Sequence, residues 1–407
     1  MEKHNNPLPA PTPLIAPNQP VDWLFVFKFN TGSFPGCDDD GTVPKEGSPG
    51  IFGGQVQHYR SGHSQQYVYA SSKNPKLVKG EGCVGATHND PLGATFGQVY
   101  NQPGYYYVLW NDQFYNNPIP TKGKPWGHSK GMLAWNEDGE GMVLQVSTPS
   151  WPASGSKAHP RQNDGNTLGC VHDDDIEVSQ HFFALKLNQK DVIAVLNALY
   201  NSSVVTDTSH PEIVQNGGPA KIQALVNKLG VKSRSRSCTT VTLSSGIQLI
   251  SKPRSIAAPP WQLVSAQLDS IPLRVASWWA EPLIYTTDEN SEITCWPAKM
   301  NKPGPVEIAI SGAWNGVSIG LKGGEGKNYN HAKIGISKDP KRPLCFFGDM
   351  NQQGALRKGY AYKNQSCSSS QNGRGGMFYV LNNPDLHASM AALIGGDTAP
   401  TSGPNGR

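Results

Sequence analysis

The sequence predicts a mixed α/β protein built from two similar lobes, and three observations lead to this prediction. The chain has 407 residues, enough to bury a large core in two domains or in one two-lobed unit. Glycine and proline are abundant, at 44 and 33 residues, and only 16% of residues are charged, which favours a strand-rich fold over a helical bundle. Finally, a His-x-Lys tripeptide occurs once in each half, as His128-Ser129-Lys130 and His331-Ala332-Lys333, and similar patterns follow each copy.

The first half of the chain reads as a series of strands. Aromatic and β-branched residues predict strands over 21–29 (VDWLFVFKF) and 105–110 (YYYVLW). After the first His-x-Lys, two apolar runs at 132–135 and 142–146 are joined by the turn sequence NEDGEG, which predicts a β-hairpin. A further run, FFALKL at 182–187, predicts the last strand of this half.

The second half repeats this order. Apolar runs predict strands over 306–310, 331–336, 344–347 and 377–381 (MFYVL). The strand over 331–336 would carry the second His-x-Lys, and a histidine and a lysine two residues apart on a strand point to the same face. The common order of elements indicates an internal duplication with almost no sequence identity between the halves.

Each half ends in a helix that begins at an asparagine. Asn188 follows the first aromatic strand and Asn383 the second; asparagine is a favoured N-cap, and Pro384 suits the first helical position. The second helix is expected to stop at Gly395 and Gly396. The expected apolar faces comprise Val192, Val195, Leu196 and Leu199 in the first helix and Leu386, Met390, Leu393 and Ile394 in the second.

A long segment lies between the halves. It contains one short helical run, 220–229, and the stretch KSRSRS at 232–237. Alternating serine and arginine can bind a phosphate backbone, but an exposed linker is the favoured interpretation. The predicted organisation is a flexible N-terminal arm (1–20), an N-terminal lobe (21–205), a connecting region (206–260), a C-terminal lobe (261–396) and a flexible tail (397–407).

Composition and hydropathy exclude several classes of protein. The net charge of +4 does not make the chain a global polycation of the kind that binds nucleic acid without specificity. No apolar run approaches the length of a membrane span, and residues 1–20 lack the apolar core of a Sec signal peptide. We therefore expect no membrane association, and either a cytoplasmic location or export by a signal-independent route.

The cysteines and the acidic clusters bear on redox state and metal binding. Seven cysteines are scattered without a Cys-x-x-Cys, so neither a zinc knuckle nor a thioredoxin-like motif is expected. Reduced core thiols are the favoured interpretation, and two or three disulfides with one free thiol are the alternative. The clusters at 38–41 (DDDG) and 172–175 (HDDD) contain ligand types suited to divalent ions, but acidic turns are more often solvated, so we expect no metal.

Four stretches contain polar residues in a recognisable order. They are Trp110-Asn-Asp-Gln113; Gly127-His-Ser-Lys-Gly131 with Val146-Ser-Thr-Pro149 and Pro152; Asn166-Thr-Leu-Gly-Cys-Val171; and His331-Ala-Lys333 with Pro343-Leu-Cys345 and Gly348-Asp-Met-Asn351. Together they resemble the deoxyribonuclease II family, a branch of the phospholipase D superfamily. The chain departs from the family pattern at Asn330, where aspartate is usual, and at Gln352, where arginine is frequent. It also lacks the signal peptide of the secreted and lysosomal animal members.

The resemblance implies a phospholipase D-like fold of two pseudo-symmetric lobes, each a mixed β-sheet flanked by helices. It also implies a metal-independent endonuclease that hydrolyses DNA through a phosphohistidine intermediate, needs no cofactor, leaves 3′-phosphate and 5′-hydroxyl ends and works best in mildly acidic conditions. The residue types allow this chemistry, because one neutral imidazole can attack phosphorus while an imidazolium protonates the leaving oxygen. Sequence alone does not assign these roles; analogy with the superfamily favours His128 as the nucleophile and His331 as the acid.

The expected site combines both His-x-Lys pairs with flanking polar residues. Its two lysines would neutralise the non-bridging phosphate oxygens, and an amide donor would add to them. Basic residues flank both pairs. Binding of the DNA backbone and simple solvated charges on loops explain these flanking residues equally well. The catalytic residues expected are His128, Lys130, His331, Lys333 and Asn351, and the substrate-binding residues expected are Ser147, Asp349, Lys122 and Lys124.

Three other functions are compatible with these patterns. A phospholipase D-like phosphodiesterase on lipid or small diesters would use the same site, and a metal-dependent nuclease would use the acidic clusters. A catalytically dead DNA-binding protein is the third, and the intact His-x-Lys pairs argue against it. DNA is the expected partner, no membrane is expected, and a homodimer is left open.

Overall fold

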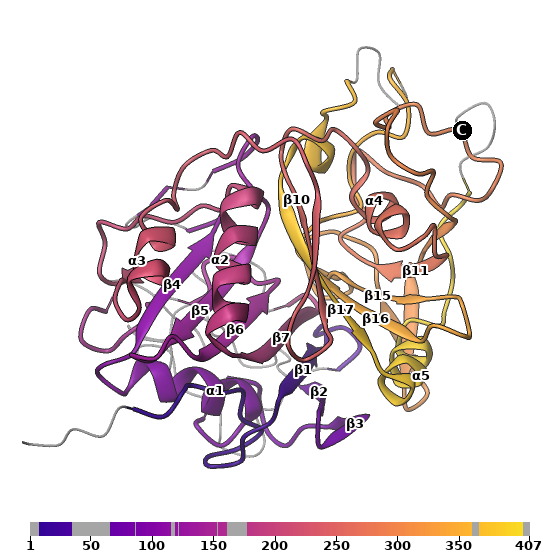
Figure 1. Cartoon of the computed structure of the whole chain (residues 1–407). Coiled ribbons are helices and arrows are strands. Elements are labelled where there is room, and N and C mark those ends of the chain that lie inside the picture. The colour runs from indigo at the N-terminus through magenta and orange to yellow at the C-terminus, as the bar shows by residue number, and fades with distance from the viewer. Residues whose placement is uncertain are drawn as a thin grey trace, which may run out of the picture.

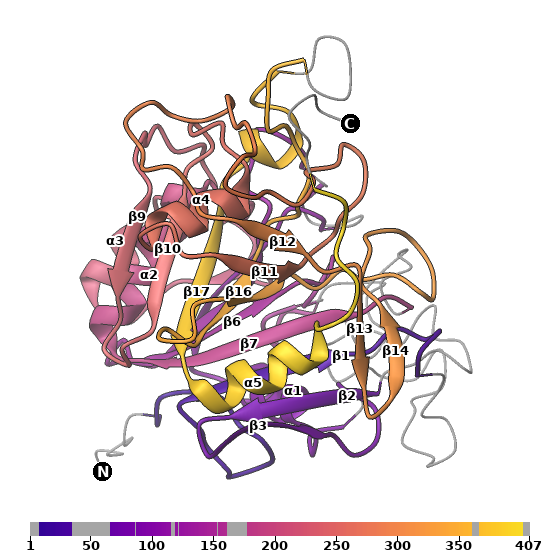
Figure 2. The same cartoon turned by 90° about the vertical axis from the view of Figure 1, so that its right-hand side faces the viewer.

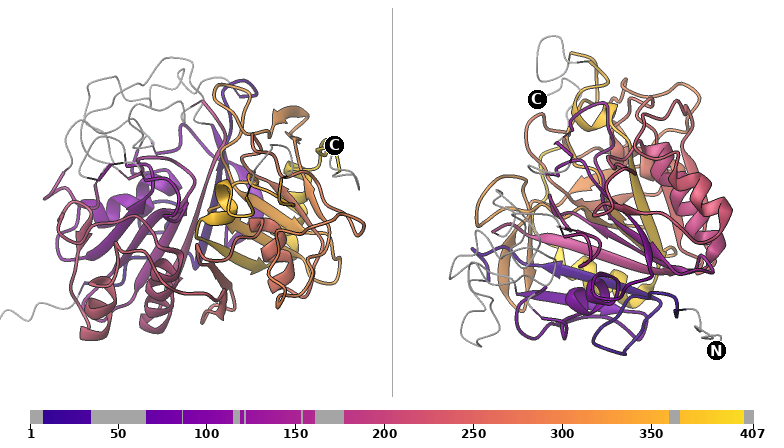
Figure 3. Two further views of the ribbon diagram at one scale, coloured as in Figure 1. Left: turned by 90° about the horizontal axis from the view of Figure 1, so that it is seen from above. Right: turned by 90° about the vertical axis from the view of Figure 1, so that its left-hand side faces the viewer.

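The computed structural model describes residues 8–34, 66–85, 87–114, 119–120, 122–152, 154–160, 177–359 and 366–401. The two halves of the chain form two lobes side by side, each with its own β-sheet and helices (Figures 1 and 3). This confirms the mixed α/β, two-lobed fold expected from the sequence.

Apolar strands build the N-terminal sheet. Over the described residues this sheet has eight strands in the order β3-β2-β1-β7-β6-β5-β4-β8. Neighbouring strands are antiparallel throughout. The strands are β1 (Trp23–Lys28), β2 (Tyr67–Ser71), β3 (Asn74–Lys79), β4 (Tyr106–Asn111), β5 (Lys130–Trp135), β6 (Gly141–Val146), β7 (Gln180–Leu187) and β8 (Val214–Gln215).

The C-terminal sheet has the same central order. Counted over the described residues, it has seven strands in the order β12-β11-β15-β16-β17-β10-β9. The strands are β9 (Thr239–Thr242), β10 (Gln248–Lys252), β11 (Leu273–Ala276), β12 (Val306–Ile308), β15 (Ile334–Ser337), β16 (Leu344–Gly348) and β17 (Gly376–Asn382). The strands β13 (Ser311–Trp314) and β14 (Val317–Gly320) form a separate hairpin.

Five central strands of the two sheets correspond in order, which confirms the expected duplication. The order β1-β7-β6-β5-β4 in the first sheet matches β10-β17-β16-β15-β11 in the second. Helices follow the same plan: α1 precedes β4 as α4 precedes β11, and α2 follows β7 as α5 follows β17. The helices are α1 (Pro91–Tyr100), α2 (Gln189–Ser202), α3 (Ala220–Val226), α4 (Pro260–Gln267) and α5 (Pro384–Leu393), with a 3₁₀ turn η3 (Ser370–Gly373).

The helices that end the two halves begin at the predicted asparagines. The side chain of Asn188 accepts from the N–H of Asp191 at 3.0 Å, and that of Asn383 accepts from the N–H of Leu386 at 3.0 Å. Each helix also touches the opposite lobe, since α2 contacts β10 and α5 contacts β3. Figure 2 shows α5 beside β2 and β3.

The lobes share an aromatic core. Phe183 of β7 and Phe347 of β16 stack with ring centroids 4.1 Å apart and an interplanar angle of 7°. Side chains alternate along a strand, so the neighbouring Phe346 points to the other face of the C-terminal sheet and packs in the core around Trp261 of α4. Strand β16 therefore contributes both to the lobe interface and to the internal core of its own lobe.

Three predicted boundaries are wrong. Residues 8–20 are fixed to the N-terminal lobe: the N–H of Leu14, for example, donates to Thr95 at 2.9 Å. Residues 397–401 are likewise attached, because the N–H of Ala399 donates to Ile308 at 2.8 Å. The predicted connecting region contains β8 of the first sheet and both β9 and β10 of the second, so the C-terminal lobe begins before residue 261.

The cysteines are not all reduced. Cys295 and Cys367 form a disulfide with an S–S distance of 2.09 Å, and Cys83 is disulfide-bonded as well. Cys238 and Cys345 are free thiols. The expectation of reduced thiols is therefore wrong; the alternative is right that disulfides form, but two thiols are free where it allowed one. Among the helices of the described residues, none is long and apolar enough to cross a membrane.

Candidate active site

The two His-x-Lys segments lie at the N-terminal ends of the equivalent strands β5 and β15. Lys130 is the first residue of β5, and His128 lies in the preceding loop. The strand β15 begins one residue after Lys333, so His331 also lies outside the strand. This corrects the expectation that each histidine and its lysine share a strand. In a loop, the backbone N–H of each histidine can bond outside its own sheet.

Each histidine is held by a backbone hydrogen bond from the opposite lobe. The N–H of His128 donates to the carbonyl oxygen of Gly375 at 2.8 Å, and the N–H of His331 donates to that of Ser179 at 2.7 Å. Gly375 immediately precedes β17 and Ser179 immediately precedes β7, so the two acceptors are equivalent residues. This reciprocal pair of bonds brings the two His-x-Lys segments to one interface.

The imidazole rings are also oriented across the interface. Nδ1 of His128 lies 2.7 Å from the backbone oxygen of Asp349, and His331 is hydrogen-bonded to the backbone of Ser147. Ser147 directly follows β6, and Asp349 directly follows β16. A carbonyl oxygen can only accept, so Nδ1 of His128 carries the proton and the lone pair of the neutral ring is on Nε2.

Lys130 belongs to a buried charge network. Its Nζ lies 2.7 Å from Oδ1 of Asp112, whose Oδ2 lies 2.7 Å from Nη2 of Arg374. Arg374 also donates to the backbone oxygen of Gly127 at 2.8 Å and so fixes the loop before His128. Burial alone would raise the pKa of Asp112, but the charges of Lys130 and Arg374 outweigh it and hold that pKa well below its usual range.

The surroundings of Lys333 differ. Its Nζ donates to the backbone oxygen of His331, and its N–H donates to Nδ1 of His181 at 3.1 Å. The strand registers assign Trp278 to the position that Asp112 holds in the first lobe. The ring of Trp278 packs edge-on against His331, with centroids 4.9 Å apart. The two half-sites therefore share a backbone arrangement, but they differ in one side chain: Asp112 in the first lobe is replaced by Trp278 in the second.

Burial and the lysines favour neutral imidazoles. Burial lowers the pKa of His128 well below its ordinary value; Lys130 and Lys333 lower it further, and Asp112 opposes them. Burial likewise lowers the pKa of His331, and the same two lysines add to the effect. Both lysine charges thus act on both imidazoles, as expected for one shared site.

Asp349 is enclosed by hydrogen bonds from the protein. Its Oδ1 accepts from Nε2 of Gln145 at 3.0 Å, and its Oδ2 accepts from the N–H of Met377 at 2.9 Å. Burial raises the pKa of this carboxyl to about 7, against the lowering effect of these bonds and of one from the Ser129 side chain. Asp349, a predicted substrate-binding residue, thus has its carboxylate bonded within the protein and its backbone oxygen against the ring of His128.

Ser147 and Asn351 lie on either side of the interface. The hydroxyl of Ser147 donates to Oε1 of Gln180 and accepts from the N–H of His181 at 2.8 Å, so it too is engaged within the protein. Nδ2 of Asn351 donates to Gln353 at 2.9 Å, while its Oδ1 is buried without a partner among the described residues.

Lys122 and Lys124 lie in the loop that leads to His128. The backbone N–H of Lys122 donates to the backbone oxygen of Asp112 at 2.7 Å. Lys124 is exposed, and its Nζ donates to Ser368 of the other lobe at 3.1 Å. Both lysines therefore flank the first His-x-Lys at its solvent side.

The two departures from the family pattern have structural accounts. Asn330 accepts from the N–H of Ala332 at 3.0 Å and donates to its oxygen at 3.1 Å, a pair of bonds that the acceptor-only carboxylate of aspartate cannot make. Gln352 is fully buried in the C-terminal lobe and donates to Gln262 at 3.2 Å. It belongs to the core, and its contacts do not assign it a role in holding a substrate.

Some expected residues lie outside the described residues, and some important ones were not expected. The stretch 166–171 and the acidic clusters at 38–41 and 172–175 fall outside what the structure describes. Within the described residues, no group of three or more histidine, cysteine or acidic residues is arranged to hold a metal ion. No local pattern pointed to Arg374, because its partner Asp112 is 262 residues away in the chain.

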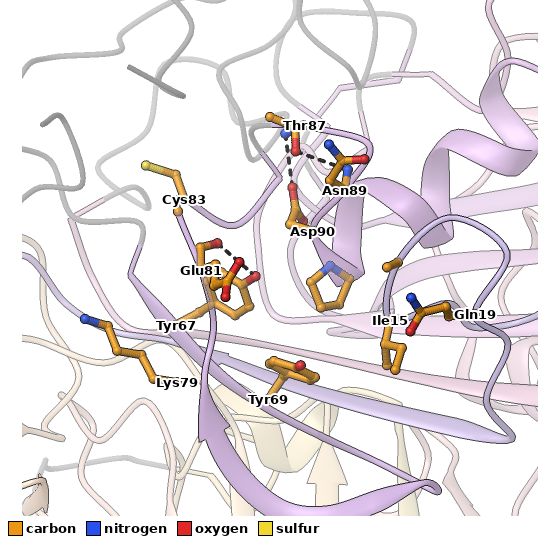
Figure 4. A pocket seen from close by; sticks show the side chains of 13 residues that line it. Ile15, Gln19, Tyr67, Tyr69, Lys79, Glu81, Cys83, Thr87, Asn89 and Asp90 are labelled. Atoms are coloured by element: carbon orange, nitrogen blue, oxygen red, sulfur yellow. Dashed lines mark hydrogen bonds between the residues drawn. The ribbon is translucent and has the colours of Figure 1, made fainter. Parts of the chain in front are cut away.

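A pocket of about 560 Å³ lies elsewhere, between the 15–19 loop, β2, β3 and the start of α1 (Figure 4). Its polar groups bond to one another: the hydroxyl of Tyr67 donates to the backbone oxygen of Glu81 at 3.3 Å, and Asp90 caps α1. The residues that line it do not include the His-x-Lys pairs, so its location does not connect it with their chemistry.

A family model of deoxyribonuclease II matches residues 52–395. The chain belongs to the deoxyribonuclease II family. It is also similar to cell-death-related nuclease 7 of Caenorhabditis elegans, with 22% identity over 348 residues that cover 82% of this chain and 77% of that protein. As a deoxyribonuclease II family member, the chain is a hydrolase with DNA as its substrate.

Proposed function

We propose that this deoxyribonuclease II family member is a metal-independent endonuclease in which two histidines divide the work on one DNA phosphodiester. The observation that carries the proposal is the reciprocal bonding across the lobe interface, in which His128 is held by Gly375 and His331 by Ser179. Lys130 and Lys333 supply positive charge near both imidazoles, which suits them to stabilising the non-bridging oxygens as charge develops.

The proposed reaction has two steps. In the first, Nε2 of His128 attacks phosphorus, the bond to the 5′ oxygen breaks, and the imidazolium of His331 gives its proton to that oxygen. In the second, neutral His331 takes a proton from water, whose oxygen attacks phosphorus and breaks the phosphorus–nitrogen bond. The products are a 5′-hydroxyl and a 3′-phosphate. Analogy favours His128 as nucleophile, and the Nδ1 contact with Asp349, which leaves the lone pair on Nε2, is compatible with it.

Substrate contacts are proposed for residues around this centre. Asn351 is suited to contribute an amide group to the phosphate, since its Oδ1 is buried without a partner among the described residues and its loop follows Asp349. Lys122 and Lys124 would contact the DNA backbone next to the cleaved bond. The 232–237 stretch extends this basic surface, because Nζ of Lys232 lies 5.5 Å from the ring centroid of Trp126, two residues before His128.

A plasmid-nicking assay in EDTA tests the proposal. We expect cleavage to persist in the chelator and the products to carry 3′-phosphate ends. Single substitutions His128→Ala and His331→Ala should each reduce the rate to less than about a tenth of wild type, because each step needs both imidazoles, and the double variant should be little worse. His88→Ala, which replaces an exposed histidine outside the His-x-Lys pairs, is the matched control. Finding 5′-phosphate ends, or dependence on Mg²⁺, would contradict the proposal.

The same assay run at different pH values tests the division of roles. One imidazole must be protonated, and burial together with the lysines lowers both imidazole pKa values below the ordinary value of about 6.5. We therefore expect kcat/KM to rise as the pH falls from about 7.5 to about 5.5 and to fall again in stronger acid, once the nucleophile is protonated. A rate that still climbs above about pH 8 would exclude an imidazolium acid.

A further inference from the structure

Two buried lysines outside the His-x-Lys pairs occupy the same position in the two lobes. Lys28 is the last residue of β1, and Lys252 is the last residue of β10, the equivalent strand. Lys28 pairs with Gln180 at the start of β7, and Lys252 pairs with Gly376 at the start of β17. Both side chains are fully buried. A buried ammonium group is costly unless it is bonded, so such a pair calls for a physical account.

Both ammonium groups donate to backbone carbonyl oxygens at equivalent positions. Nζ of Lys28 lies 2.7 Å from the oxygen of Val178, and Nζ of Lys252 lies 2.7 Å from the oxygen of Arg374. Lys252 also donates to the oxygen of Asn372 at 2.8 Å. Val178 and Arg374 each stand two residues before the strand that follows them, β7 or β17.

The next peptide along the chain holds a histidine of the opposite lobe. Ser179 follows Val178, and its oxygen accepts from the N–H of His331. Gly375 follows Arg374, and its oxygen accepts from the N–H of His128. Each buried lysine is therefore one peptide away from the carbonyl that holds a catalytic histidine across the interface.

The chemistry of the bond suits this task. A charged donor binds a carbonyl more strongly than a neutral one, and a bond buried in low dielectric fixes its partner more firmly. Burial lowers the pKa of Lys252 to about 7, which shows how strongly its surroundings disfavour the charge. The burial of a lysine at the equivalent position of both lobes indicates that an N–H donor is required there, which a methionine of similar shape would not supply.

We propose that Lys28 and Lys252 are positioning residues that act across the lobe interface: Lys28 sets His331 through the 178–179 segment, and Lys252 sets His128 through the 374–375 segment. The proposal rests on the two-histidine function above and adds to it a crossed dependence, in which each lobe positions the histidine of the other. Lys252 has the additional effect of fixing Arg374, whose guanidinium bonds to Asp112 and to Gly127.

The test compares Lys28→Met and Lys252→Met with the exposed β7 variant Lys186→Met in the full chain. Steady-state kinetics on a short DNA duplex should show kcat lower by about 10-fold to 100-fold with KM within about twofold, because small misplacement of a catalytic group costs rate more than binding. Lys28→Gln and Lys252→Gln retain an N–H donor and should recover part of the rate. The control should match wild type.

Imidazole NMR of the histidine-labelled protein gives the decisive readout. In Lys252→Met the ring resonances and titration of His128 should shift while those of His331 stay, and Lys28→Met should show the reverse. Unchanged kcat, or equal shifts of both imidazoles in each variant, would overturn the proposal. If a methionine variant does not fold, the glutamine variant is read in the same way. Activity in His128→Ala would contradict the proposed two-histidine function and not the positioning by the lysines. The imidazole resonances would then still show whether Lys28 and Lys252 position the two histidines.

Discussion

At the scale of single residues, the two half-sites are alike in backbone and unlike in charge. Lys130 is paired with Asp112, which is in turn paired with Arg374, whereas Trp278 stands at the position equivalent to Asp112 in the second lobe. Asp112 opposes the lowering of the His128 pKa. Two groups that perform different steps of one reaction need different electrostatic surroundings, and this difference is compatible with unequal roles for the two histidines.

The site lysines should matter more for turnover than for binding. In the proposed mechanism Lys130→Ala and Lys333→Ala each remove a charge that would stabilise the transition state, so we expect rate losses on the order of 10²–10³, with much smaller losses in DNA affinity. Single-turnover kinetics and a binding titration with DNA separate the two effects. Equal losses in both would reduce these lysines to docking charges.

Lys130 should have a second, structural effect. Its removal takes one of two cations from the buried carboxylate of Asp112, which Arg374 still balances, so the unfolding free energy should fall by less than the about 3–5 kcal/mol that a fully broken buried ion pair costs. Adding Asp112→Asn to Lys130→Ala leaves Arg374 without its carboxylate and should lower the stability further, without restoring activity. Urea denaturation measures both variants; a double variant at least as stable as Lys130→Ala would contradict this account.

At the scale of elements, period and capping were enough to predict the two terminal helices and most of the central strands, but not β2, β10 or β11. Apolar strands such as β1, β6 and β7 are buried on both faces and give continuous apolar runs. The edge strands β3 and β9 were not predicted. All residues of β9 and half of those of β3 are exposed. Such edge strands pair with one neighbour and face solvent, so their sequences contain no apolar pattern.

The helix caps support a prediction at this scale. Asn188→Ala and Asn383→Ala each remove an acceptor for a backbone N–H in the first turn, so each should lower the unfolding free energy by about 1 kcal/mol. Asn197→Ala, on the exposed face of α2, is the control and should be neutral or slightly stabilising because alanine favours helix. Activity at saturating DNA should not change. A loss of activity at constant stability would mean that the caps set the site directly.

At the scale of the whole molecule, the sequence predicted the two His-x-Lys pairs and the duplication but not the way in which they meet. The bonds that assemble the site join residues far apart in the chain, such as Gln145 with Asp349 and His128 with Gly375. These contacts depend on how one folded lobe packs on the other, and no local pattern encodes that packing. For the same reason the sequence drew no attention to Lys28, which lies within the predicted strand 21–29, or to Lys252, which lies within the predicted connecting region.

The packing of the lobes also fixes how stability depends on pH. His128, His181 and His331 have pKa values lowered by burial, so below about pH 6.5 the unfolded chain binds more protons than the folded one and acid destabilises the fold. Asp349 has the opposite effect. Its pKa is raised by burial to about 7, so between about pH 4 and its folded pKa the folded state holds the extra proton, and acid favours the fold.

Asp349 therefore offsets one of the histidines at the acidic pH where the enzyme is expected to work, and Asp349→Asn should expose that compensation. In the variant, the unfolding free energy should fall more steeply with acidification from about pH 6.5 to about pH 5, by about 1.4 kcal/mol per pH unit, the value for one proton. Urea denaturation at several pH values measures the slope, and the exposed variant Asp22→Asn is the control. The same slope in wild type and Asp349→Asn would mean that Asp349 is ionised in the folded protein throughout this range, and the compensation would have to come from Asp90, whose pKa burial raises to about 6.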